Sequence, residues 1–181
     1  MLNEKQQKRL LEIARKTLEE YIRNGKAPEF KETDPALTEK RGGFVTLTRN
    51  GQLRGCIGYI EGVLPLYLTV AEMAVKASTE DYRFSPVKPD ELKDISIEIS
   101  ALTPLELIND INKIEVGKHG LIIRKGYASG LLLPQVATAY NWDKYEFLDQ
   151  TCVKAGLAPG AWKDKDAKIY IFSAQVFGEE K

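Results

Sequence analysis

FVTLTRNGQLRGCIGYI, residues 44–60, predicts a β-hairpin. Two runs rich in β-branched and aromatic residues, 44–49 and 52–60, flank the pair Asn50-Gly51. An Asn-Gly pair between such runs is the strongest short-range hairpin signal, because both turn residues must adopt positive φ. We therefore expect two antiparallel strands joined by a two-residue turn, and the least ordinary residues of the chain lie on the second of them.

The second strand carries the hexapeptide LRGCIG, residues 53–58. A cysteine between two glycines and two residues after an arginine indicates a functional site, although it does not say which reaction occurs there. Side chains alternate between the two faces of a strand. In a regular two-residue hairpin Arg54 pairs with Leu47 and Cys56 pairs with Val45, so all four side chains should share one face, with Gly58 beside them.

Arg54 and Cys56 are expected to lie about 7 Å apart at Cα. A guanidinium at that distance would favour the thiolate form of the cysteine, and Gly58 would let a ligand or another backbone approach. The alternative is that Cys56 is a small buried hydrophobic residue, which is the commonest state of a free cysteine. The sequence leaves both interpretations open.

The composition is that of an ordinary globular protein. The chain has 181 residues, no formal net charge and a pI of about 6.6, so a broad nucleic-acid-binding surface is not expected. Two cysteines give no disulfide framework. No signal peptide and no membrane-spanning segment are visible, which predicts a cytoplasmic protein, or a nuclear one in a eukaryote.

Hydrophobic periodicity predicts an α+β fold with a mostly antiparallel sheet and flanking helices. We expect one domain over residues 1–181, or two interleaved subdomains. Residues 26–43 are expected to form a long connection. The predicted helices cover residues 4–23, 66–78 and 143–154, with a further helix from Pro134, and the predicted strands beyond the hairpin cover residues 94–102, 121–125, 131–133 and 168–177.

Cys56 and His119 are the candidate catalytic residues, as a nucleophile and its base. His119 is the single histidine of the chain and lies in a Gly-Lys-His-Gly loop. The alternative is a loop histidine that hydrogen-bonds its own backbone. No metal site is predicted, because Cys56 and Cys152 lack the close spacing of zinc ligands, and Cys152 falls on an apolar helix face. No cofactor is predicted.

Arg54 and Arg83 are the candidate anion-binding residues. Arg83 lies in the turn-rich segment DYRFSP, residues 81–86, where Asp81 could orient it. An arginine held in this way can bind a carboxylate or phosphate with two hydrogen bonds. The alternative is a structural ion pair that fixes the loop. Gly55 and Gly58 complete the predicted substrate-binding set.

These motifs resemble the AMMECR domain family, whose signature is the hexapeptide at residues 53–58. The segment from Asp81 is similar to the second family block, with Tyr82 in place of the usual proline. Further blocks match at residues 119–121, 133–137 and 147–157, and Ala139 stands near a position where the family often carries glutamate. The resemblance covers nearly the whole chain.

The resemblance implies an α+β fold of two unequal subdomains, with a groove between them near the signature hairpin. It implies no established activity. Fusions of relatives to Memo-like and radical-SAM modules hint at a modification pathway. The leading hypothesis is a site for a small-molecule or peptide substrate around Leu53 to Gly58, in an enzyme or an enzyme partner. The alternative is a protein- or RNA-binding module in which the hexapeptide is structural core, and the neutral charge counts against RNA.

Overall fold

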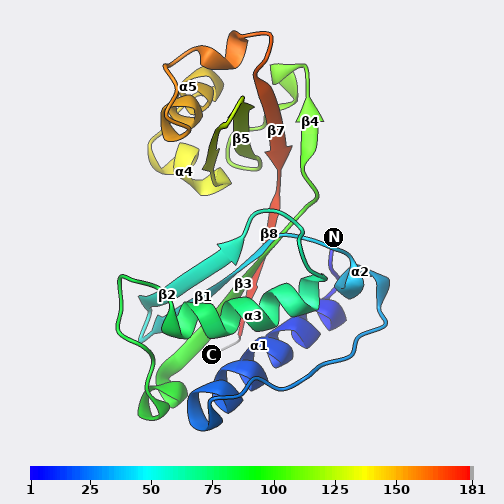
Figure 1. Cartoon of the computed structure of the whole chain (residues 1–181), viewed down its shortest axis with the longest axis vertical. Helices are drawn as coiled ribbons and strands as arrows, with labels where there is room; N and C mark the ends of the chain where they lie inside the picture. Colours follow the sequence, from blue (N-terminus) through cyan, green and yellow to red (C-terminus); the bar gives the residue numbers. More distant parts are fainter. Residues whose placement is uncertain (180–181) are drawn as a thin grey trace. The chain divides into compact units, whose positions relative to one another are not determined.

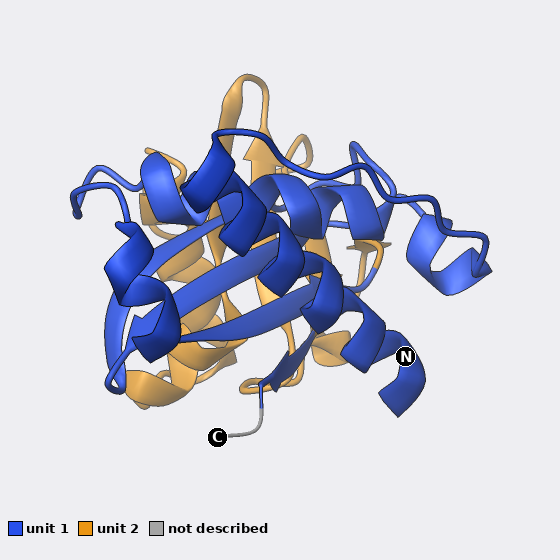
Figure 2. Cartoon of the chain, turned by 90° about the horizontal axis from the view of Figure 1, so that it is seen from below, with its two compact units in different colours: residues 1–103, 175–181 blue, residues 104–174 orange. Residues whose placement is uncertain are grey.

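The computed structural model describes residues 1–179 and divides into two compact units, coloured separately in Figure 2. Unit 1 comprises residues 1–103 and the chain from residue 175 onward, and unit 2 comprises residues 104–174. Each unit combines helices with a four-stranded antiparallel sheet. The predicted α+β fold class is therefore confirmed.

Unit 1 is a sheet with the strand order β2-β1-β3-β8 and two long helices (Figure 1). The helices are α1 (Glu4–Asn24) and α3 (Leu66–Thr79), with a short helix α2 (Pro35–Thr38) and a 3-10 helix η1 (Pro89–Asp94) in the connections. The strands are β1 (Gly43–Arg49), β2 (Gln52–Tyr59), β3 (Ile95–Leu102) and β8 (Ala174–Gly178).

The two long helices of unit 1 cover one face of its sheet (Figure 2). Helix α1 begins at a capping box between Asn3 and Gln6 and ends at Gly25, which has φ 69°, a left-handed conformation that glycine adopts without strain. Its apolar stripe and that of α3 pack on Val45 and Leu47 of β1 and on the apolar face of β3. We call this side of the sheet the helix face, and the other side the open face.

Unit 2 is a smaller sheet with the strand order β4-β7-β5-β6, packed against one helix. The core centres on Phe147, Leu148 and Cys152 of that helix, all fully buried, so Cys152 is a core residue as predicted. The strands are β4 (Glu106–Ile108), β5 (Gly120–Lys125), β6 (Ala128–Leu132) and β7 (Lys168–Phe172), and the helices are α4 (Pro134–Ala139), α5 (Lys144–Lys154) and the 3-10 helices η2 (Ile111–Lys113) and η3 (Ala161–Lys163).

The predicted strand over residues 168–177 is wrong in one respect, because it is two strands. It breaks at Ser173, and β7 pairs in the sheet of unit 2 whereas β8 pairs in the sheet of unit 1. The apolar residues of this segment predict extended backbone, but they do not show that the chain passes from one sheet to the other. The predicted short strand at 131–133 in fact begins at Ala128, and β4 and α2 were not predicted.

The β1–β2 hairpin forms as predicted at its turn, where Asn50 has φ 51° and Gly51 has φ 78°. Its register then departs from a regular hairpin. Leu53 pairs with Thr48, but the next pair joins Gly55 to Leu47, so Arg54 has no partner of its own. This extra residue is a β-bulge, which bends the strand and shifts the register by one.

The bulge overturns the predicted faces of the hexapeptide. Cys56 pairs with Thr46 and not with Val45, and Gly58 pairs with Phe44. Because a shift of one residue moves every later side chain to the other face, Cys56 and Gly58 lie on the open face. Gly55 lies on the helix face, where a Cβ would overlap the carbonyl oxygen of Ala77 in α3.

We expect the substitution Gly55→Ala to destabilise unit 1 by about 3 kcal/mol, because the obstacle is helix backbone that cannot move aside. Gly178→Ala is the matched control, since the nearest atom to its added Cβ is the Ile97 oxygen at 3.3 Å. Urea unfolding followed by circular dichroism measures both variants. Equal stability of the two variants would contradict the close packing of α3 on β2.

Candidate functional site

Arg54, the bulged residue, forms an ion pair with a buried carboxylate. Its Nε and Nη2 atoms donate to the two carboxylate oxygens of Glu91 at 3.0 and 2.9 Å. Its Nη1 atom donates to the Ser85 carbonyl oxygen at 2.9 Å. The side chain is 13% exposed. The guanidinium that was predicted to bind substrate thus has protein partners at all three nitrogens, and it fixes the 85–91 segment against β2.

Glu91 collects several donors around one carboxylate. Besides Arg54, the Arg49 Nη1 atom and the Lys88 backbone amide donate to it at 3.0 and 2.8 Å. Hydrogen bonds from Arg54 outweigh the burial of the side chain and lower the pKa of Glu91 to about 2. The carboxylate is therefore ionised throughout the physiological range.

Cys56 lies on the open face with a side chain that is only partly buried. The Thr46 hydroxyl, on the neighbouring strand, donates to its Sγ atom at 3.2 Å. Its backbone amide points away from β1 and donates to the Asp81 Oδ2 atom at 2.9 Å. The sulfur is thus held beside the outer edge of β2, where the 81–84 segment runs.

Asp81 anchors an arginine beside this cysteine. The carboxylate is 3% exposed and accepts hydrogen bonds from the Arg83 Nε and Nη2 atoms at 2.9 and 2.7 Å. These bonds hold the pKa of Asp81 well below its usual range, against the effect of burial. The same bonds raise the pKa of Arg83, with a smaller contribution from the charge of Cys56.

Arg83 presents its second edge to solvent. Asp81 occupies the edge formed by Nε and Nη2, and the side chain remains 44% exposed. Within residues 1–179 the structure gives the Nη1 atom no hydrogen-bond partner. A guanidinium donates from five N–H groups in a planar fork, so the edge formed by Nη1 and Nη2 can take a second carboxylate or a phosphate.

Gly58 lies under an aromatic ring on the open face. A Cβ at this position would overlap the ring of Phe44, so the glycine makes room for a protein side chain. Further along the face, β3 presents Glu98, which is exposed, next to Thr46 in the sheet register. The open face therefore combines a thiol, hydroxyl groups and an aromatic ring.

His119 has a local partner in unit 2. It lies in the loop before β5, and its Nδ1 atom accepts a hydrogen bond from the Glu115 backbone amide at 3.1 Å. In a neutral imidazole the other nitrogen then carries the proton and acts as a donor. This is the loop role that the sequence left open, and a role as base for Cys56 stays a prediction.

Neither a group of metal ligands nor a membrane-spanning helix is found among the described residues. Within residues 1–179 no group of three potential metal ligands is close enough to hold an ion. None of the helices there combines the length and apolar character needed to cross a bilayer.

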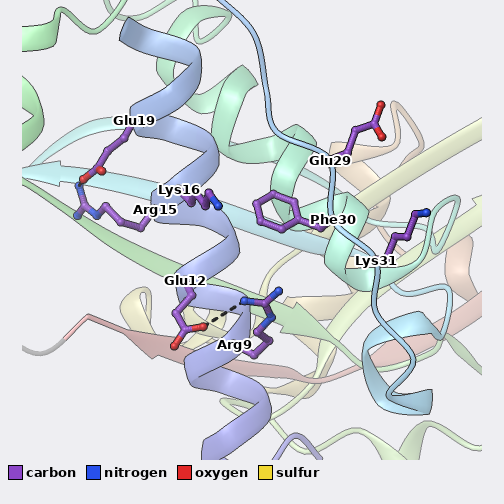
Figure 3. A pocket seen from close by; sticks show the side chains of 8 residues that line it. All are labelled: Arg9, Glu12, Arg15, Lys16, Glu19, Glu29, Phe30 and Lys31. Atoms are coloured by element: carbon purple, nitrogen blue, oxygen red, sulfur yellow. Dashed lines mark hydrogen bonds and ion pairs between the residues drawn. The ribbon is translucent and has the colours of Figure 1, made fainter. Parts of the chain in front are cut away.

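A cavity of about 540 Å³ lies between α1 and the 29–31 segment (Figure 3). Its lining is mostly charged. Arg9 pairs with Glu12 at 3.2 Å and with Glu32 at 2.7 Å, and Arg15 approaches Glu19 at 4.0 Å. Because Arg9 and Arg15 each pair with two carboxylates, whereas Arg83 pairs with Asp81 alone among the described residues, this cavity offers less unused binding capacity than the Arg83 site.

Two residues of the site were missed in the sequence. Thr46 contacts Cys56 only because of the bulge, which no turn or periodicity signal announces. Glu91 stands in a polar run without periodicity and resembles a surface residue. A buried glutamate in η1 is instead the partner that Arg54 requires.

Comparison with known proteins identifies the relatives of this chain. The family model AMMECR1 matches residues 11–177. A protein of Thermococcus onnurineus is 50% identical, with 94% of this chain and 89% of the relative covered. A protein of Methanopyrus kandleri is 48% identical, with 95% and 87% covered. The names of these relatives state no activity.

A solved structure supports the fold. The crystal structure of uncharacterized protein PH0010 from Pyrococcus horikoshii is similar to this chain with a TM-score of 0.80 and 46% identity. The match covers 94% of this chain and 90% of that one. The resemblance inferred from the hexapeptide and the 81–86 segment is therefore confirmed at the level of family and fold.

We expect Glu91→Gln to destabilise the protein by about 3 kcal/mol at neutral pH, because it leaves the Arg54 guanidinium buried without its counter-charge. The pKa of Glu91 is lowered on folding. Its contribution is therefore complete above the ordinary glutamate pKa and is lost as the pH falls toward about 2. Urea unfolding between about pH 7 and about pH 3 should show a shallower loss of stability in the variant, and equal slopes would contradict the ion pair.

We expect iodoacetamide to alkylate Cys56 in the folded protein and Cys152 only after unfolding. Cys152 is fully buried, and burial raises the pKa of its thiol, whereas Cys56 is partly exposed on the open face. Peptide mass spectrometry measures both sites in one sample, with Cys152 as the internal control. If Cys56 also reacted only in denaturant, it would be a core residue and the open-face assignment would be wrong.

Proposed function

This chain belongs to the AMMECR1 family, and we propose that it binds a small anionic molecule or an anionic peptide on the open face of unit 1. In this proposal Arg83 is the anion anchor, and Cys56 is the thiol that the bound ligand contacts. The observation that carries it is the free edge of the Arg83 guanidinium, which a buried carboxylate holds beside a partly exposed cysteine.

The buried Asp81 is the main support for a binding role. It fixes both the Cys56 amide and the Arg83 guanidinium, so the two groups keep a constant relation. An arginine immobilised in advance loses less side-chain entropy when it binds an anion. A purely structural ion pair would not need to leave Arg83 about half exposed.

In this proposal some residues of the hexapeptide are structural and another contacts the ligand. Arg54 and Gly55 maintain the structure, through Glu91 and through α3, and Cys56 serves the ligand. The same division favours a second candidate, a non-catalytic binding module, because most of the hexapeptide is then structural. A role as an enzyme or an enzyme partner in a modification pathway requires in addition that the Cys56 thiol reacts with the bound ligand.

Alkylation by two reagents of similar size and different charge tests the anion anchor. We expect iodoacetate to react with Cys56 faster, relative to iodoacetamide, than it does with a free model thiol, because Arg83 attracts its carboxylate. Arg83→Gln should lower the iodoacetate rate about threefold to fivefold and leave the iodoacetamide rate nearly unchanged. Arg83→Lys should retain part of the preference.

Arg23→Gln is the matched control, because Arg23 is an exposed arginine in the last turn of α1 and its loss changes the net charge equally. Thermal unfolding of each variant verifies that it is folded. A preference for iodoacetate that Arg83→Gln and Arg23→Gln reduce equally would reflect net charge alone and would contradict the proposal. The proposal would also be contradicted if the protein without substitutions showed no preference for iodoacetate.

A further inference from the structure

A hollow at the tip of the β1–β2 hairpin adjoins the Arg83–Cys56 site. Its volume is about 490 Å³, within the usual range of ligand pockets. Phe84 connects it to the site, because the Arg83 guanidinium carbon lies 5.5 Å from the centre of the Phe84 ring. Six residues line the hollow: Arg49, Asn50, Gln52, Leu53, Arg54 and Phe84.

One apolar residue that lines the hollow, Leu53, lies on the same face of the sheet as the thiol. Leu53 pairs with Thr48, and Cys56 pairs with Thr46, so the bulge between them leaves both side chains on the open face. Leu53 is 42% exposed, and Phe84 is partly buried. A ligand held at Arg83 therefore has apolar side chains within reach along the strand.

The arginines of this region are more exposed than the carboxylates that pair with them. Arg83 is 44% exposed and its partner Asp81 is 3% exposed, whereas Arg49 is 41% exposed and pairs with Glu91, 9% exposed, and with Asp94, 33% exposed. The carboxylate that neutralises Arg83 is thus withdrawn from the surface. An anionic ligand meets guanidinium groups first, and a cationic ligand is disfavoured.

We infer that the ligand of this site is a carboxylate with an apolar group a few bonds away, such as the C-terminal residue of a peptide or a short branched carboxylic acid. The carboxylate pairs with the Nη1 and Nη2 edge of Arg83, and the apolar group occupies the hollow between Leu53 and Phe84. This inference rests on the proposed function and adds the second half of the ligand. Phe84 keeps the two groups close, because its ring lines the hollow and its centre lies 5.5 Å from the Arg83 guanidinium carbon.

Nuclear magnetic resonance titrations with small probes test the inference without requiring that Cys56 react. N-acetylleucine carries both groups, N-acetylglycine carries the carboxylate alone, and N-acetylleucinamide carries the apolar group alone. The backbone amide shifts of Leu53, Cys56 and Phe84 report binding. We expect N-acetylleucine to bind about tenfold more tightly than either of the other two, because the hollow buries part of its side chain.

Two variants assign the two halves of the ligand. Leu53→Ala should remove the advantage of N-acetylleucine over N-acetylglycine, whereas Val176→Ala, at another exposed apolar residue of the same sheet, should preserve it. Arg83→Gln should weaken both carboxylates. A further probe, 4-methylpentanoate, shows whether the ligand is a free acid or a peptide terminus. If 4-methylpentanoate binds as tightly as N-acetylleucine, the ligand is a free acid. If it binds more weakly than N-acetylleucine, the ligand is a peptide terminus.

The outcomes separate this inference from the function on which it rests. If N-acetylglycine binds as tightly as N-acetylleucine and Arg83→Gln weakens both, the anion site stands and the inference about the hollow is overturned. If N-acetylleucinamide binds as tightly as N-acetylleucine and Arg83→Gln does not change either affinity, the hollow is an apolar contact surface. The inference and the proposed function are then both overturned.

Discussion

The ion pair between Arg54 and Glu91 is the interaction on which the rest of unit 1 depends. It fills the position where β2 gains one residue over β1, and it joins that bulge to the segment from Ser85 to Glu91. A buried ion pair is seldom a large net source of stability, because both charges lose their hydration. Its main effect here is on position, since the guanidinium has partners at all three nitrogens and so ties the bulge to the segment from Ser85 to Glu91.

The bulge decides which residues of the hexapeptide pack against the helices and which lie on the open face. A regular hairpin would place Cys56 against Val45, under the helices, and would turn Gly55 outward. The shift of one residue instead lets α3 approach the backbone at Gly55 and brings Cys56 beside Thr46. Asp81 then closes the outer edge of β2 and presents Arg83 next to the sulfur. The packing of Gly55 against α3 and the position of Cys56 on the open face are both consequences of the same inserted residue.

Much of this fold could be predicted from the sequence, because its signals are local. The Asn50-Gly51 turn, the helix predicted over 4–23 and the strand predicted over 94–102 each depend on neighbouring residues, and each occurs close to its predicted bounds. The register of the β1–β2 hairpin could not be predicted, because the bulge depends on the distant partner Glu91. Glu91 stands in a polar run, and nothing in that run marks it as the partner of Arg54. The division of residues 168–177 between two sheets is non-local in the same way. For the candidate site, the sequence drew attention to Cys56 and Arg83, whose role stays a prediction, but it did not predict the geometry that brings them together through Asp81.

The most direct test of this account is the register of the hairpin in solution. Cys56 directs its amide away from β1, toward Asp81, so it forms a non-hydrogen-bonded pair with Thr46, in which the α carbons lie only about 4.5 Å apart. A nuclear Overhauser spectrum should therefore show a strong contact between the α protons of Thr46 and Cys56. Pairing of Cys56 with Val45 instead, as in a hairpin without the bulge, would place the thiol on the helix face and would contradict the account.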